Sequence, residues 1–214
     1  MARKNNDTKE KIYKEAFKLF MSKPYELVTI SDIEKAIGMT RGAVFYYVKD
    51  KEDLFKEVIE RYFLTNQYLH NRIEYDKLDL NMSFSDFIDV FISGVERTIS
   101  ELYVFGGVNE KSDRQAYAKI DRSYLSLVMT TGYYFGDFNE KMSNLLIMER
   151  NTWSFFLQKG IEKGEIKPGT DVRLYGELFS YTFLGLALND SLNNGIDLKH
   201  LKRLYMQLYH QIKC

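Results

Sequence analysis

The sequence predicts an all-α protein in which an N-terminal three-helix domain precedes a larger helical domain. Only two prolines and thirteen glycines interrupt 214 residues, which favours long helices over many short strands. Apolar residues recur at helical spacing, and no segment alternates convincingly between apolar and polar residues. We expect a first domain over residues 1–50, a connecting helix over 51–72 and the larger domain over 73–214.

The first predicted helix spans residues 8–22. Ile12 and Ala16 lie on its apolar face, which continues through later residues at helical spacing. Thr8 is a residue type that caps helix N-termini, and Pro24 cannot continue a helix. These signals place the helix boundaries.

Two short helices follow and meet at Gly38. Thr29 is positioned to cap the first of them, and the second covers residues 40–47. Glycine at the junction accepts the positive φ that a tight turn between helices requires. Ile33 on the first helix and Val44 on the second supply apolar contacts that fix the angle. The pattern predicts a helix-turn-helix at about residues 28–49.

The rest of the chain is predicted to form helices of ordinary or greater length. Their expected ranges are 50–72, with Asp50 as its cap, then 83–106, 108–138, 139–163, 171–192 and 197 to the end. The segment 108–138 is one helix or two, interrupted around Gly132 and Gly136. Residues 73–82 are polar and irregular, and they mark the expected domain boundary.

The second short helix carries the chemistry expected of DNA recognition. Small residues at Gly42 and Ala43 let it sit deep in a major groove about 12 Å wide. Arg41 is able to donate two hydrogen bonds to a guanine edge. The side chains predicted to project outward are Thr40, Arg41, Gly42, Ala43 and Tyr46. Those predicted to reach flanking phosphates are Tyr46, Tyr47, Lys49 and Lys51.

The charge distribution agrees modestly with this interpretation. The whole chain carries 30 basic and 30 acidic residues. Residues 1–51 nevertheless have eleven Lys or Arg against seven Asp or Glu, an excess of four positive charges. DNA affinity depends on phosphates neutralised locally, so one positive segment is sufficient. The neutral total therefore does not exclude a nucleic-acid partner.

The segment TISDIEKAIGMTRGAVFYYVKDKEDLF resembles the DNA-binding region of the TetR family of transcriptional regulators. The resemblance covers Thr8 to Leu54 and rests on the glycine turn, the Gly-small-aliphatic-aromatic run and the Lys-x-Lys-acidic-acidic-Leu run. It implies phosphate contacts from Thr29, Ser31, Tyr46, Tyr47 and Lys51. It implies that Arg41, Gly42, Ala43 and Phe45 face the bases or the groove wall.

The last two predicted helices indicate a homodimer. The helix 171–192 is apolar almost all round, so it needs cover on more than one face. Pairing with a second copy would build a four-helix bundle, as the resemblance also implies. The expected interface residues are Leu174, Leu178, Tyr181, Gly185, Leu188, Leu201, Tyr205 and Leu208. The alternative is that both helices only close the core of a monomer.

The middle helices are rich in aromatic residues, which indicates an apolar pocket for a small ligand. The expected lining residues are Phe91, Tyr103, Tyr124, Tyr133, Trp153 and Phe156. The alternative for each residue is an ordinary place in the core. If a ligand binds there, we expect it to favour a state of the protein that binds DNA less well. The expected function is therefore a repressor that the ligand releases from a pseudo-palindromic operator. An activator stays an alternative.

Other function classes have little support in the sequence. The histidines, His70, His200 and His210, lie far from any motif, and no metal-binding, nucleophile or phosphate-loop pattern occurs. We therefore expect no enzyme, catalytic residue, metal or cofactor. A helical adaptor that binds a protein partner and not DNA is the competing hypothesis. The absence of an apolar leader or spanning segment, and the lone Cys214, favour a cytoplasmic protein without membrane contact.

Overall fold

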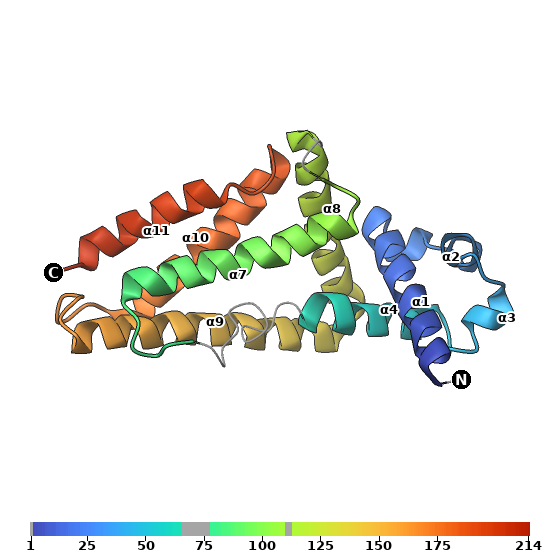
Figure 1. Ribbon diagram of the computed structural model, residues 1–214, viewed down its shortest axis with the longest axis horizontal. Coiled ribbons are helices and arrows are strands. Elements are labelled where there is room, and N and C mark those ends of the chain that lie inside the picture. Colours follow the sequence, from blue (N-terminus) through green and yellow to red (C-terminus); the bar gives the residue numbers. More distant parts are fainter. Residues whose placement is uncertain (1, 66–77, 110–112) are drawn as a thin grey trace. The chain divides into compact units, whose positions relative to one another are not determined.

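The computed structural model describes residues 2–65, 78–109 and 113–214, with side chains from Asp7 onward (Figure 1). In these ranges the α-helices are α1 (Ala2–Ser22), α2 (Ile30–Ile37), α3 (Arg41–Val44), α4 (Lys51–Ile59), α7 (Phe84–Phe105), α8 (Arg114–Tyr134), α9 (Gly136–Glu162), α10 (Val172–Leu192) and α11 (Leu198–Ile212). A 3-10 helix, η1 (Tyr25–Leu27), precedes α2, and a π-helical stretch, η2 (Glu60–Leu64), continues α4. The predicted all-α class is confirmed.

Capping side chains set most helix starts where the sequence predicts them. The side-chain oxygens that accept hydrogen bonds from backbone N–H groups of the first turn belong to Thr29, Asp50, Ser83, Asp171 and Asp197. Such a cap satisfies donors that have no partner within the helix.

The ends of three predicted helices differ from the structure. α1 begins at Ala2 and not at Thr8, because the polar residues before Thr8 contain no glycine or proline to stop a helix. α3 ends at Val44, earlier than the predicted end at Tyr47. The predicted helix 50–72 is described only as far as Thr65, so its last residues and most of the predicted boundary at 73–82 lie outside the described residues.

The chain divides into two compact units. The first unit comprises Met1–Asn66 together with Ser123–Gly136, the end of α8. Its core is formed by apolar side chains from α1, α2 and α4, with Phe20 set edge-on to Phe55 at 4.8 Å between ring centroids. Phe135, which follows the end of α8, completes this core, because its ring stacks on Phe55 at 5.2 Å between ring centroids. The first unit therefore includes a segment from much later in the sequence.

The second unit comprises Gln67–Arg122 and Asp137–Cys214, and its core is unusually aromatic. Trp153 of α9 is fully buried and stacks on Phe179 of α10 at 4.7 Å between ring centroids. Phe91 of α7 and Tyr205 of α11 contact the same indole ring. Four helices thus meet around one tryptophan. No described helix of either unit has the length and apolar character needed to cross a lipid bilayer.

Glu165, in the turn between α9 and α10, joins three parts of the second unit. Its carboxylate accepts hydrogen bonds from the backbone N–H groups of Phe84 and Ser85 at the start of α7. It also accepts one from the Tyr209 hydroxyl of α11 at 2.7 Å. Burial, together with this bond, raises the pKa of Tyr209. A carboxylate at a helix N-terminus stabilises both the unpaired N–H groups and the helix dipole.

Replacing Glu165 with alanine is expected to lower the free energy of unfolding by about 1–2 kcal/mol. The change leaves two backbone N–H groups and one phenol without their acceptor. Urea unfolding followed by circular dichroism measures the loss. Glu162→Ala is the control, because Glu162 pairs with Lys159 on the exposed side of α9 and caps no helix. An equal loss in both variants would contradict the capping role of Glu165.

Candidate nucleic-acid interface

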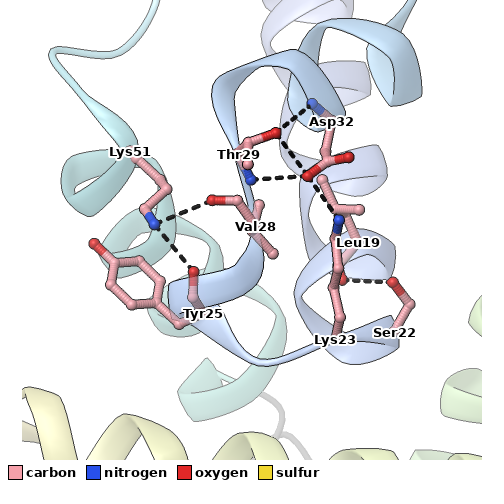
Figure 2. A network of polar contacts seen from close by, with 8 residues as sticks. All are labelled: Leu19, Ser22, Lys23, Tyr25, Val28, Thr29, Asp32 and Lys51. Atoms are coloured by element: carbon pink, nitrogen blue, oxygen red, sulfur yellow. Dashed lines mark hydrogen bonds and ion pairs between the residues drawn. The ribbon is translucent and has the colours of Figure 1, made fainter.

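A reciprocal cap fixes the start of α2. The Thr29 hydroxyl accepts from the backbone N–H of Asp32, and the Asp32 carboxylate accepts from the backbone N–H of Thr29 at 2.9 Å (Figure 2). Lys23, at the end of α1, donates to the same carboxylate at 2.6 Å. The bond from Lys23, followed by the bonds from Thr29, holds the pKa of Asp32 far below its usual range. α2 therefore begins at one defined residue.

The turn between α2 and α3 depends on Gly38, as the sequence predicts. Gly38 has a φ of +72°, a conformation that side chains with a Cβ rarely adopt. Its backbone N–H donates to the carbonyl oxygen of Glu34 at 2.9 Å. Ile33 and Ile37 are buried beneath the turn, and so is Val44 of α3. These contacts set α3 at a fixed angle to α2.

α3 presents a small, exposed and positively charged surface. Arg41 and Gly42 are exposed and Ala43 is half-buried. The guanidinium of Arg41 lies 5.7 Å from the centre of the Phe45 ring, close enough for a cation–π contact. Tyr46 follows with 76% of its surface exposed. A helix end with so little side-chain bulk is able to approach the base edges of a major groove closely.

The predicted DNA-contacting residues are gathered on the α2–α3 side of the first unit, with unequal exposure. Exposed residues are Thr29, Ser31, Thr40, Arg41, Gly42, Tyr46 and Lys49. Half-buried residues are Ala43, Phe45, Tyr47 and Lys51. The Thr29 hydroxyl is also engaged in the cap, where it donates to the Asp32 carboxylate at 2.7 Å.

Lys51 has an additional role that the sequence does not predict. Its ammonium donates to the backbone carbonyl oxygens of Tyr25 at 3.0 Å and Val28 at 3.1 Å (Figure 2). It also lies 4.2 Å from the centre of the Tyr25 ring. Lys51 thereby ties the start of α4 to η1 and to the residue that precedes the Thr29 cap. A contact between a side chain and distant backbone carbonyls leaves no pattern in a sequence.

Tyr25 and its neighbour connect this region to the end of α8 within the first unit. The Tyr25 ring lies 5.8 Å from Phe135 and 5.9 Å from Tyr134. A hydrogen bond between Glu26 and Tyr134 lowers the pKa of the carboxyl and raises the pKa of the phenol to about 12. The sequence patterns predict none of these contacts. Their partners are more than a hundred residues apart, so local periodicity does not reveal them.

The N-terminal segment matches a known family. Residues 12–58 match the family model described as bacterial regulatory proteins, tetR family. This N-terminal segment is a TetR-type DNA-binding region. This match confirms the predicted resemblance, and it covers the cap, the turn, α3 and nearly all of α4. The protein is a DNA-binding transcriptional regulator of the helix-turn-helix type.

Similarity to individual TetR-family proteins extends through the second unit. The negative transcriptional regulator IcaR of the biofilm operon icaADBC of Staphylococcus aureus (strain Newman) is 24% identical over 154 residues, covering 68% of this chain and 81% of IcaR. The crystal structure of a TetR-family regulator from Cytophaga hutchinsonii has a TM-score of 0.65 at 14% identity, covering 98% of this chain and 96% of the other. The SmeT–triclosan complex has a TM-score of 0.61 at 18% identity, covering 96% and 89%. The two structures establish the shared fold.

The predicted ligand residues do not form a single group. Phe91, Trp153 and Phe156 lie in the core of the second unit, where Phe156 stacks on Phe87. Tyr103 belongs to the same unit but donates its hydroxyl hydrogen bond to Asp121.

Tyr124 and Tyr133 belong to the first unit, on the end of α8. Tyr124 stacks on Phe63 at 4.9 Å between ring centroids. Tyr133 is 81% exposed, so the structure does not bury it in the apolar pocket that the sequence predicts. The neighbouring Thr131 of α8 is buried, and Phe135, just after the end of α8, is half-buried.

The predicted dimer residues divide into two sets. Those on α10 form one exposed row, comprising Leu174, Leu178, Tyr181, Gly185 and Leu188. Leu201 and Tyr205 on α11 are fully buried in the core of their own unit. The prediction that these two contact a partner chain is therefore wrong, because α11 turns that face toward α7 and α10. Leu208 is half-buried against the same core.

Proposed function

We propose that this regulator is a homodimeric repressor that binds a pseudo-palindromic operator and is released by a small apolar or aromatic ligand in the cytoplasm. The observation that carries the proposal is the exposed surface of α3, with Arg41 at its start and Tyr46 just beyond its end. One such surface reads only a few base pairs. Two copies about 34 Å apart read successive major grooves and reach useful specificity.

A second copy of the chain is the proposed cover for the exposed row on α10. Leu174, Leu178, Tyr181, Leu184, Leu188 and Leu192 are between 37% and 65% exposed and recur at helical spacing. A contiguous apolar face of this kind is uncommon on a monomer. Contact between the same row on two copies gives an isologous interface with two-fold symmetry. That symmetry matches a pseudo-palindromic operator.

The proposed effector site surrounds Trp153. Its indole Nε1 is buried and has no hydrogen-bond partner among the described residues. An unsatisfied buried donor is costly, so a ligand with an acceptor group and an aromatic body complements this position. SmeT, which shares the fold, is known in complex with triclosan, an observation that supports an aromatic effector here. The negative regulator IcaR supports repression as the outcome.

Gel-shift titration against DNA upstream of the protein's own coding region tests operator binding. We expect the logarithm of the affinity to fall steeply and linearly with the logarithm of salt concentration. Equal affinity at low and high salt, or no binding, would favour the adaptor hypothesis. Because Trp153 is the only tryptophan, quenching of its fluorescence by triclosan tests the effector site directly. Absence of both quenching and DNA release would show that triclosan is not an effector of this protein.

Arg41→Ala is expected to relax base preference at one position of each half-site, with a cost of about 1–3 kcal/mol against the preferred base. The guanidinium is exposed on α3, and no buried contact depends on it. Binding to a library of single-base operator variants measures the preference. Lys35→Ala, which removes an exposed charge from α2, is the control and is expected to leave the preference unchanged. Unaltered base preference in Arg41→Ala would contradict direct readout by this residue.

A further inference from the structure

Asp121 of α8 is a carboxylate buried in the second unit. It is 3% exposed. Its Oδ2 atom accepts hydrogen bonds from the Tyr103 hydroxyl at 3.1 Å and from the backbone N–H of Ile196 at 3.2 Å. Its Oδ1 atom is buried and has no hydrogen-bond partner within the described residues. One half of the carboxylate is thus satisfied and the other half is not.

The two donors come from different elements, so Asp121 joins three parts of the fold. Tyr103 lies on α7, and Ile196 lies in the turn between α10 and α11. This turn runs directly against α8. Gly195 has a φ of +82°, and a Cβ there would lie 2.9 Å from the Cβ of Tyr117. Beside it, Arg122 Nη1 donates to the Ser191 carbonyl oxygen at 2.8 Å, which adds a second tie between α8 and the end of α10.

The charges near Asp121 act on its pKa in opposite directions. Asp190, from α10, raises the pKa of Asp121, and Arg122 lowers it. Asp197, after the turn, instead accepts from the backbone N–H of His200 at the start of α11. Burial is the largest effect, and it raises the pKa of Asp121 to about 6 despite the hydrogen bonds from Ile196 and Tyr103. Burial beside Asp121 also raises the pKa of Tyr103.

We propose that Asp121 is a proton-sensitive latch that holds α7, α8 and the α10–α11 turn together when its carboxyl is neutral and loosens when the carboxylate ionises. A neutral carboxyl at Asp121 requires no buried charge and keeps an acceptor for Tyr103 and Ile196. An ionised carboxylate places a charge in the interior with one oxygen unsatisfied, which is unfavourable in a low-dielectric environment.

The direction of the pH effect follows from linkage. The pKa of Asp121 in the fold lies above the value near 4 of an unfolded chain. Between these two values the folded protein binds more protons than the unfolded chain. The contribution of Asp121 to stability is therefore present at low pH and is lost as pH rises through about 6. The pH dependence of this contribution is therefore opposite in sign to that of carboxylates with a lowered pKa, such as Asp32.

Asp121 lies on a helix that contributes residues to both units, so its ionisation can serve as a regulatory input in addition to ligand and DNA binding. α8 is one continuous helix, and its residues from Ser123 onward belong to the first unit. A change in how the first half of α8 is held therefore acts on a helix that also completes the core of the DNA-binding unit. The latch adds a proton input to the regulator, and its test does not require an operator.

The full-length protein and Asp121→Asn are compared by urea unfolding between pH 4.5 and 8. Asparagine keeps one acceptor but does not ionise. We expect the ratio of the wild-type to the Asp121→Asn unfolding constant to rise with pH through about 6 and to level off above it, with a total change of about 25-fold over this pH range. Glu101→Gln, at an exposed position of α7, is the matched control and should follow the wild-type curve throughout. Parallel curves for wild type and Asp121→Asn would overturn the proposal.

A second variant separates a titrating latch from a merely structural carboxylate. Tyr103→Phe removes a donor that stabilises the ionised form, so the midpoint of the pH transition is expected to move to higher pH. An unmoved midpoint would count against the latch. If Asp121→Asn does not fold, carbon NMR of the wild-type side-chain carboxyl decides the question. A titration midpoint near 6 supports the latch, and a midpoint near 4 refutes it.

Discussion

Replacing Leu178 and Leu188 together with glutamate is expected to convert the protein into a monomer and to lower its operator affinity at least about a hundredfold. Both side chains belong to the exposed apolar row of α10. An interface formed by two such rows would have to bury four unpaired carboxylates, which costs several kcal/mol. A monomer would then engage each half-site separately. Sedimentation velocity measures the oligomeric state, and gel shift measures the affinity.

Val104→Glu is the control for the double glutamate variant. Val104 is 75% exposed on α7 and is not part of the α10 row, so the added charge should leave both mass and affinity unchanged. A double variant that sediments as a dimer with normal DNA affinity would show that this row is not the interface between copies. Loss of dimerisation without loss of DNA affinity would contradict the proposal that two copies act together on the operator.

Replacing Lys51 with methionine is expected to lower the free energy of unfolding by about 2–3 kcal/mol and to weaken binding to all DNA sequences together. Methionine retains most of the side-chain bulk but removes the donor shared by the carbonyl oxygens of Tyr25 and Val28. The residue before the Thr29 cap then loses its fixed position. Calorimetry and gel shift on the same preparation give the two quantities.

Lys49→Met provides the comparison that identifies the role of Lys51. Lys49 is exposed, and its backbone N–H donates to the Asp53 carboxylate. Its replacement should leave the melting temperature unchanged. It should reduce by about one the magnitude of the slope of the logarithm of DNA affinity against the logarithm of salt concentration. Identical behaviour of the two variants, with full stability and a reduced slope, would mean that Lys51 acts as a simple phosphate contact.

The local features of this protein are largely predictable from its sequence. The caps at Thr29 and Asp50 and the turn at Gly38 depend on a few consecutive residues, and each lies where the sequence predicts it. The break between α8 and α9 also falls within the expected region, although Gly132 lies inside α8 and only Gly136 marks the boundary.

Features that depend on distant residues are not predictable in the same way. Helical periodicity identifies an apolar face on α11 but does not reveal whether the face meets the chain's own core or a partner. Leu201 and Tyr205 were therefore assigned to the wrong surface. The roles of Lys51, Glu165 and Asp121 likewise depend on backbone groups far along the chain. A charged residue in a sequence gives no sign of being buried until its neighbours are known.

The contribution of α8 to the first unit limits how far the DNA-binding region is an autonomous folding unit. A fragment ending near Asn66 would contain the whole segment matched by the family but would lack Tyr124 and Phe135. Phe63 and Phe55, which stack against those two rings, would then face water. Such a fragment is expected to be aggregation-prone and of reduced stability. Transplanting this helix-turn-helix onto another effector domain would therefore require carrying the end of α8 with it.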